Sequence, residues 1–200
     1  SEAIWDVWKK KAGGDSRKFL VICNSVKTAQ RLYRELEKLT QQENVRIHLL
    51  HSKFTGDDRK KKEREILEVG ETGRKAHEIW IATSVVEASL DIDFDYLFTE
   101  LLDLFSLFQR MGRVNRKGIK DIDEVNCYVY LQLQDSPLRC FQSQNPRYRF
   151  VDNDIYLLSK EAMETVDGIL SETKKTNLIN EYLSAEKLEK TGYVKQYEQI

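Results

Sequence analysis

The chain has 200 residues, of which 40% are hydrophobic and 32% are charged, and its formal net charge is −1. This length fits one domain with an appended subdomain and is long enough to bury a substantial core. No apolar run approaches the ~20 residues of a bilayer-spanning helix, no secretory signal opens the chain, and the three cysteines form no C-x-x-C pair. These features argue against a membrane protein, a disulfide framework and a zinc site, and they predict a cytoplasmic protein with reduced thiols.

Positive charge is concentrated in the first part of the chain. Residues 1–120 hold 23 Lys/Arg against 19 Asp/Glu, whereas residues 121–200 hold 9 against 14. A polyanion is therefore expected to meet the first part. A net charge this close to zero does not favour strong nonspecific binding of nucleic acid by this chain alone.

The first two predicted elements are a short helix and a buried strand. Trp5 and Trp8 lie on one apolar face of a helix over residues 2–11, and we expect them to pack rather than to stack on a ligand. After a Gly-rich break, the run KFLVIC at residues 18–23 is typical of a strand buried on both faces of a parallel sheet. We therefore predict that residues 1–16 form a lead-in helix and linker.

Asn24 and Ser25 follow this strand directly and precede a predicted helix over residues 26–39. Asn and Ser are favoured N-cap residues, and a helix start also presents free N–H groups that bind phosphate. A cap and a contact to nucleic-acid phosphate are therefore two open interpretations of this pair.

The next predicted strand, residues 45–50, ends at His51 and Ser52, and a capped, strongly charged helix follows over residues 59–69. Most cations of this helix are expected to be solvated, but Arg59 lies in its first turn, close to the strand end. A lone histidine is rarely a metal ligand, so we predict no metal site and leave His51 as a satisfied loop residue or a nucleic-acid contact.

A third predicted strand, residues 78–83, ends at the small hydroxyl side chains of Thr83 and Ser84. Hydroxyl groups in this position are suited to hydrogen bonds with phosphate or ribose. Asp91 lies a few residues further on; a carboxylate does not favour phosphate but can accept a hydrogen bond from a ribose hydroxyl.

The most distinctive motif is QRMGRVNRKG at residues 109–118, which we expect on a helix. On a helix, Arg113 and Arg116 are neighbours on one face, and two adjacent guanidiniums make a bidentate clamp for phosphate. Gln109 shares that face, and Gly112 lets the helix approach a partner surface closely. The plainer alternative is a basic surface helix.

Strands that alternate with helical segments over residues 17–131, the last two at 95–99 and 125–131, predict an α/β fold. We expect a three-layer parallel sheet with helices on both faces. Because the candidate site residues follow strands or begin helices, we also expect them to converge on one edge of the sheet.

Residues 132–200 are predicted to form a linker and a small helical extension. Residues 147–149 (RYR) lie in a crossing loop and are either a surface loop or a nucleic-acid contact. We expect one helix over residues 160–170, capped by Ser159, and another over residues 177–183.

Two motifs that ATP hydrolysis needs do not occur in the sequence. There is no G-x-x-x-x-G-K-[ST] phosphate loop and no D-E-x-[DH] element for magnesium. We therefore expect no ATP hydrolysis by this chain alone, because arginine fingers act only on a nucleotide that other groups already hold.

Residues 18–118 resemble the second RecA-like domain of superfamily 2 helicases, and more narrowly that of the CRISPR-associated helicase-nuclease of type I interference systems. The resemblance covers about half of the chain and rests on four segments, NSVKTA (24–29), LHSKF (50–54), VVEASLDIDFD (85–95) and QRMGRVNRKG (109–118). Ser89 stands where many superfamily 2 helicases have Gly, and this departure favours the CRISPR family over RNA helicases of the DEAD-box type.

The resemblance implies a three-layer RecA-like fold and an ATP-dependent translocase on single-stranded DNA. It also implies a preceding RecA-like domain that holds most of the ATP and magnesium, an HD nuclease domain, and recruitment by a guide-RNA surveillance complex. By resemblance, Arg113 and Arg116 are arginine fingers. The residues assigned to nucleotide are Gln109, Gly112 and Asp91, and those assigned to DNA are Asn24, Ser25, His51, Ser52, Arg59, Thr83 and Ser84.

Two other functions stay open from the sequence. One is a general superfamily 2 helicase of DNA repair or RNA metabolism. The other is a docking module derived from a helicase domain and without enzymatic activity, although a docking surface has no need of a paired arginine motif.

Overall fold

The structure, a computed structural model, describes residues 1–11, 16–41, 43, 45–87, 90–118, 125–132 and 153–193. The chain divides into two compact units, residues 1–100 with 109–129 and residues 101–108 with 130–200. The predicted crossing loop with the RYR segment lies outside the described residues. No helix in the described ranges is long and apolar enough to cross a membrane.

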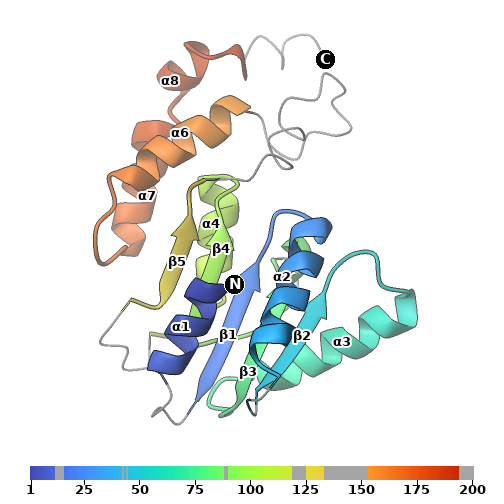
Figure 1. Cartoon of the computed structure of the whole chain (residues 1–200). Coiled ribbons are helices and arrows are strands. Elements are labelled where there is room, and N and C mark those ends of the chain that lie inside the picture. The colour runs from blue at the N-terminus through green and yellow to red at the C-terminus, as the bar shows by residue number, and fades with distance from the viewer. Residues whose placement is uncertain are drawn as a thin grey trace. The chain divides into compact units, whose positions relative to one another are not determined.

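The first unit is built on a parallel β-sheet with the spatial order β2-β3-β1-β4-β5 (Figure 1). β1 pairs in parallel with β3 and β4, and β2 pairs in parallel with β3. The strands are β1 (Arg17–Ile22), β2 (Arg46–Leu50), β3 (His77–Ala82), β4 (Tyr96–Glu100) and β5 (Cys127–Tyr130). Each predicted strand is present, with its ends shifted by at most two residues.

Helices flank this sheet, and their bounds follow capping side chains. Ser25 and Thr55 each accept a hydrogen bond from the backbone N–H three residues later, which fixes the starts of two helices. The helices are α1 (Glu2–Lys10), α2 (Val26–Leu39), α3 (Gly56–Val69) and α4 (Leu104–Met111), with a short 3₁₀ turn η1 (Ser84–Val86). The predicted helix over residues 26–39 is confirmed, and α3 begins three residues earlier than expected.

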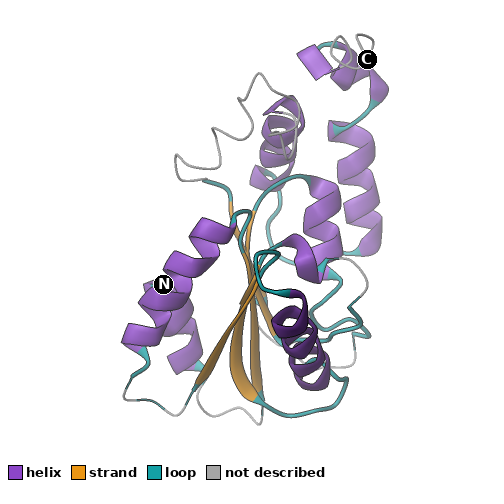
Figure 2. Ribbon diagram, turned by 90° about the vertical axis from the view of Figure 1, so that its right-hand side faces the viewer, coloured by secondary structure: helices purple, strands orange, loops and turns teal. Residues whose placement is uncertain are grey.

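The side chains of β1 alternate between two cores. Phe19 and Val21 pack with α1 and α2 on one face, whereas Leu20 and Ile22 pack with α3 on the other. The sheet therefore has helices on both faces, as Figure 2 shows. Burial on both faces explains why this strand is a continuous apolar run rather than an alternating one.

The aromatic side chains of α1 belong to the core. Trp5 and Trp8 are buried, and the Trp8 ring meets the Phe19 ring edge-on, with 5.0 Å between centroids. The prediction that these tryptophans pack is confirmed, and α1 is part of the first unit.

The second unit contains α6 (Asn153–Glu164), α7 (Glu172–Tyr182) and α8 (Ala185–Glu189). Its small core contains Leu104, Ala162, Leu178 and Tyr182. This helical extension was expected, but its helix boundaries were not.

The prediction that Ser159 caps a helix is wrong. Ser159 lies in the middle of α6, is fully buried, and its Oγ accepts a hydrogen bond from the backbone N–H of Leu104 at 3.2 Å. The sequence Ser-Lys-Glu resembles a helix start, but here the hydroxyl satisfies the first turn of another helix, which a local pattern does not reveal. The following helix likewise starts five residues before the predicted residue 177, because Ser171 caps it.

Candidate functional site

Polar side chains follow three neighbouring strands of the sheet. Backbone hydrogen bonds join these strand ends, from Cys23 N to the Ala82 carbonyl at 2.8 Å and from Thr83 N to the Leu50 carbonyl at 3.2 Å. We call this region the carboxyl edge. It brings together the predicted residues Asn24, Ser25, His51, Ser52, Thr83 and Ser84.

Several of these side chains make hydrogen bonds or ring contacts within the protein itself. His51 is 4% exposed, its Nδ1 accepts a hydrogen bond from Lys53 N at 3.2 Å, and its ring stacks on Phe54. Burial lowers the pKa of His51, so the imidazole is neutral at pH 7. Ser25 caps α2, with Oγ accepting from Thr28 N at 3.0 Å. His51 therefore offers a phosphate no positive charge, and the cap interpretation of Ser25 is confirmed.

Two other predicted residues at this edge face solvent. Ser52 and Ser84 are exposed, whereas Thr83 is buried at 6%. Arg59, in the first turn of α3, donates from Nε to the Glu63 carboxylate at 2.7 Å. Ser52 and Ser84 are thus the hydroxyl groups that a ligand at this edge reaches most directly.

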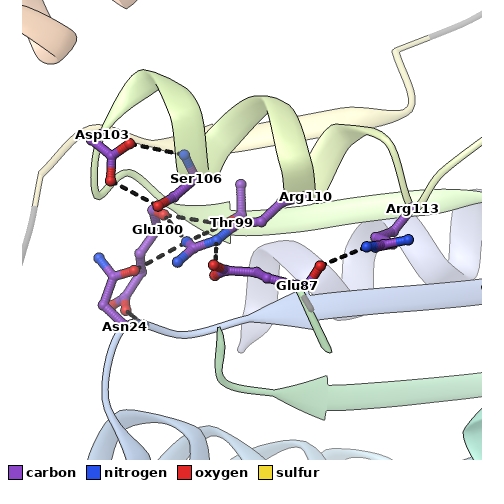
Figure 3. A network of polar contacts seen from close by, with 8 residues as sticks. All are labelled: Asn24, Glu87, Thr99, Glu100, Asp103, Ser106, Arg110 and Arg113. Atoms are coloured by element: carbon purple, nitrogen blue, oxygen red, sulfur yellow. Dashed lines mark hydrogen bonds and ion pairs between the residues drawn. The ribbon is translucent and has the colours of Figure 1, made fainter. Parts of the chain in front are cut away.

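Arg110 is the organising residue of the carboxyl edge, and the sequence interpretation missed it. Its side chain is 1% exposed. Nε donates to the Glu87 carboxylate at 2.8 Å, and Nη1 donates to Thr99 Oγ1 at 2.9 Å and to Asn24 Oδ1 at 3.0 Å. Figure 3 shows how these side chains converge from different elements.

The same network includes Glu100. Its carboxylate accepts a hydrogen bond from Asn24 N at 2.6 Å, and its backbone carbonyl accepts from Arg110 Nη1 at 2.7 Å. Burial raises the pKa of Glu100, while the bond from Asn24 N and the Arg110 charge lower it. One buried cation therefore joins the ends of β1 and β4 to the segment after η1.

A sequence signal for Arg110 does exist. Leu104, Leu107 and Arg110 are spaced by three residues and all are buried. A charged residue in register with the apolar face of a helix must find partners, because an unpaired buried charge is very costly. Read in this way, Arg110 predicts a network of acidic and polar groups.

The prediction that Arg113 and Arg116 lie on a helix is wrong, because α4 ends at Met111. Val114 is buried and forms a parallel bridge with Phe94, and Asn115 has a positive φ of 44°. Burial of Val114 and this pairing draw the backbone out of the helix. We call residues 112–116 the arginine turn. Gly112 lies in this turn rather than in a helix, so the expected close approach of a helix there is also wrong.

The arginine turn still brings its predicted cations and Asp91 together. Arg116 forms an ion pair with Asp91, and both side chains are largely exposed. Arg113 is half-buried, and its Nη2 donates to the Glu87 carbonyl. Burial, together with the neighbouring positive charge of Arg116, lowers the pKa of Arg113. Among the described residues, nothing accepts a hydrogen bond from the buried Arg113 Nε.

The predicted residues form two groups rather than one. The arginine turn is tied to the segment that enters β4, through bonds from Phe94 N to the Arg113 carbonyl at 2.9 Å and from Arg116 N to Asp93 Oδ1 at 3.1 Å. The expectation of a single edge is therefore wrong for Arg113 and Arg116, because α4 carries the chain back from the exit of β4. Glu87 connects the groups, since its carboxylate bonds Arg110 and its carbonyl bonds Arg113 (Figure 3).

Gln109 is exposed in the last turn of α4, at the position next to the buried Arg110. In the described part of the chain, no group of three or more His, Cys, Asp and Glu side chains is arranged to hold a metal ion. The arrangement offers two adjacent guanidiniums for an anion, but no ligand set for a cation.

A family model and individual known proteins indicate the same family for this chain. Residues 15–119 match the family described as CRISPR-associated nuclease/helicase Cas3, C-terminal. The CRISPR-associated endonuclease/helicase Cas3 of Escherichia coli K12 is 44% identical over 98 residues, which are 48% of this chain and 11% of that protein. The matched part of the chain thus spans about a tenth of the length of this relative.

Solved structures agree on the fold. A crystal structure of T. fusca Cas3-AMPPNP superposes with a TM-score of 0.75 at 19% identity, over 100% of this chain and 23% of that one. A chain of a CRISPR RNA-guided surveillance complex, pre-nicking, superposes with a TM-score of 0.64 at 21% identity, over 98% and 25% of the two chains. The predicted RecA-like fold is confirmed.

A family match over more than half of the chain, carried by the segments that contain the carboxyl edge and the arginine turn, identifies it: the chain belongs to the family of CRISPR-associated nuclease/helicase Cas3 C-terminal domains.

Proposed function

We propose that this chain is the second motor domain of an ATP-dependent translocase on single-stranded DNA that acts in type I CRISPR interference. In this proposal residues 17–131 form the RecA-like helicase domain, residues 1–16 lead into it and residues 132–200 extend it. A preceding RecA-like domain and an HD nuclease domain complete the enzyme, a guide-RNA surveillance complex recruits it, and it works in the cytoplasm.

The observation that carries the proposal is the state of the two arginines. Arg113 and Arg116 are close enough for the charge of one to lower the pKa of the other, and the only carboxylate that Arg116 pairs with in the described chain is the exposed Asp91. An anion between the guanidiniums would relieve their repulsion and could accept from the buried Arg113 Nε. The donor set therefore fits a phosphate group.

ATP, when bound by the preceding domain with Mg²⁺, would supply a γ-phosphoryl group whose transition state for hydrolysis carries negative charge on the γ-phosphoryl oxygens and on the leaving β-phosphate. Arg113 and Arg116 would stabilise that charge, an effect of about 10³–10⁵ in rate for an arginine finger. Gln109 and Gly112 would lie against the same phosphates, and Asp91 would exchange its ion pair with Arg116 for a ribose hydroxyl.

The carboxyl edge would hold the DNA backbone. Exposed Ser52 and Ser84 would donate hydrogen bonds to phosphates, with Arg59 as the nearby cation. Asn24, Ser25, His51 and Thr83 would contribute by shaping the edge and through their remaining hydrogen-bonding groups. Glu87 supports the coupling of DNA to nucleotide, because it bonds Arg110 of the carboxyl edge and Arg113 of the arginine turn.

The test is ATP turnover by the enzyme that joins this domain to a preceding RecA-like domain. Arg113→Ala and Arg116→Ala should each lower DNA-stimulated kcat by about 10³-fold or more, with the Kd for ATP changed only a few-fold. Arg64→Ala, which removes an exposed cation from α3, is the matched control and should leave kcat unchanged. Wild-type kcat in both arginine variants would refute the proposal.

A further inference from the structure

A basic pocket of about 720 Å³ lies at the amino ends of β1, β2 and β3. We call it the amino-edge pocket. β1 is six residues long, so at about 3.3 Å per residue this edge is roughly 20 Å from the carboxyl edge. The pocket is therefore separate from the strand ends to which the proposed function assigns DNA.

Among the residues that the structure describes, five cationic side chains line the pocket, against two carboxylates. The cations come from α1, from the starts of β1 and β2, and from the approach to β3: Lys9, Arg17, Arg46, Arg74 and Lys75. Leaving His77 out of the count, the described lining residues carry a surplus of three positive charges, whereas the whole chain carries −1. A concave surface with one sign of charge concentrates the opposite charge within it.

Arg17 is held in a fixed orientation at this pocket. Its guanidinium lies over the Trp8 ring, 4.7 Å from the centroid, Nε donates to His77 Nδ1 at 3.1 Å, and Nη1 donates to the Trp8 carbonyl at 3.4 Å. No carboxylate in the described part of the chain forms an ion pair with it. Nη2 thus stays available on a pre-oriented cation, and such preorganisation favours binding of an anion.

The carboxylates near the other arginines neutralise them weakly. Arg46 is 80% exposed and lies 3.8 Å from Glu78, whose Oε2 already accepts from the Trp80 indole at 3.2 Å. Arg74 lies 3.9 Å from Glu68, and both side chains are largely exposed. Both ion pairs are long and the arginine of each is exposed, so they are worth little and a phosphate displaces them at small cost.

The geometry points to a second site for the sugar-phosphate backbone of a single nucleic-acid strand, read without regard to base sequence. Arginine forks suit phosphate, and Trp5 and Trp8 are buried, so their faces are not open to bases or to apolar side chains of a peptide. The choice of nucleic acid over an acidic protein segment as the ligand rests on the proposed function. The presence of an anion-binding site in this pocket does not depend on that function.

The first test measures binding of the 200-residue chain to a fluorescein-labelled oligothymidine of about 20 nucleotides, without ATP or magnesium. Arg46→Ala/Arg74→Ala/Lys75→Ala should raise Kd about tenfold at about 50 mM salt and make the salt dependence of log K shallower by about 2. Lys60→Ala/Lys61→Ala/Arg64→Ala removes the same charge from the exposed face of α3 and should change Kd less than twofold.

A second test needs no variant and so does not depend on folding of the triple mutant. In lysine acetylation footprinting of the wild type, oligothymidine should protect Lys9 and Lys75 but not Lys60 and Lys61. Equal loss of binding in both triple variants, or unprotected Lys9 and Lys75, overturns the inference. If the pocket variant loses binding of poly-glutamate but keeps binding of oligothymidine, the inference is overturned in favour of an acidic protein partner. Because no ATP is present, these outcomes are independent of the turnover test.

Discussion

Arg110 illustrates how a single buried cation determines local geometry. It is 1% exposed and bonds groups from three separate segments, including the Glu87 carboxylate at 2.8 Å. Removing one partner of such a pair leaves an uncompensated charge in the interior. The free-energy cost of that charge is much larger than the stabilisation that the intact pair provides.

We therefore expect Arg110→Met to lower the free energy of unfolding by about 3–5 kcal/mol. Arg110→Met/Glu87→Gln should recover part of this loss, because the orphaned carboxylate is then removed as well. Gln109→Ala, at the exposed neighbouring position, is the control and should change stability by less than about 0.5 kcal/mol. Urea denaturation measures all three; equal stability of Arg110→Met and Gln109→Ala would contradict the role of the network.

Also at the scale of single residues, the buried thiol of Cys23 predicts that the free energy of unfolding depends on pH. Burial, and then the nearby Glu100 carboxylate, raise the pKa of Cys23 to about 12 from an ordinary 9.0. Above pH 9 the unfolded thiol ionises while the folded one does not, so the free energy of unfolding falls as pH rises from about 9 towards 12.

Between pH 8 and pH 10 the wild type should lose roughly 1 kcal/mol more stability than Cys23→Ala, in which this titration is absent. Urea denaturation of both proteins at the two pH values measures the difference, and other alkaline titrations cancel in it. A parallel loss in the two proteins would show that the thiol does not resist ionisation.

At the scale of elements, Gly70 determines how α3 ends against the next segment. A Cβ at this position would lie 2.6 Å from both Cβ and Cγ2 of Ile92, a fully buried residue. The Gly70 carbonyl also accepts from Asp93 N at 2.7 Å, so the segment cannot move away without losing this bond. Gly70 thus permits the approach that places Asp91 and Asp93 beside the arginine turn.

Gly70→Ala should destabilise the protein by about 1–3 kcal/mol, because overpacking forces a shift of buried groups. Gly56→Ala is the matched control: nothing lies within 4 Å of its Cβ, and alanine favours the helix that begins there. The control should be neutral or more stable by up to about 1 kcal/mol. Thermal unfolding of both variants measures the contrast, and similar losses in the two would argue against the close contact with Ile92.

How far the sequence predicts these elements depends on how local their causes are. The strand at residues 17–22 was predictable because burial on both faces leaves a continuous apolar run. The arginine turn was not, since the helix ends through pairing of Val114 with Phe94, a contact between residues 20 apart. Ser159 has a local cap pattern, but its hydroxyl accepts a hydrogen bond from the backbone N–H of Leu104, 55 residues away.

The same distinction applies to the candidate site. Residues directly after strands could be placed at the carboxyl edge, because parallel strands end together. The role of Arg110, and the division between the carboxyl edge and the arginine turn, depend on side-chain bonds over long separations, such as Arg110 to Asn24. The motif QRMGRVNR therefore predicts two neighbouring arginines, which the structure places after the end of α4, and their action as a phosphate clamp stays a prediction.

At the scale of the whole molecule, we propose that the chain supplies half of a nucleotide pocket. Its cations lie together, but no cluster of metal-binding side chains occurs in the described ranges, and the sequence has no phosphate-loop motif. We therefore propose that Arg113 and Arg116 act together on one phosphate group that a neighbouring domain supplies. Two groups that act as a unit have strongly non-additive effects when removed.

The most direct measurement is single-turnover ATP hydrolysis by the enzyme that joins this domain to a preceding RecA-like domain, with enzyme in excess over ATP and at saturating single-stranded DNA. The wild type, Arg113→Ala, Arg116→Ala and the double variant are compared. If both arginines stabilise one phosphate, each single change lowers the rate by about 10³-fold or more, and the double change lowers it little further. Single variants that hydrolyse ATP within about twofold of the wild-type rate would contradict the account.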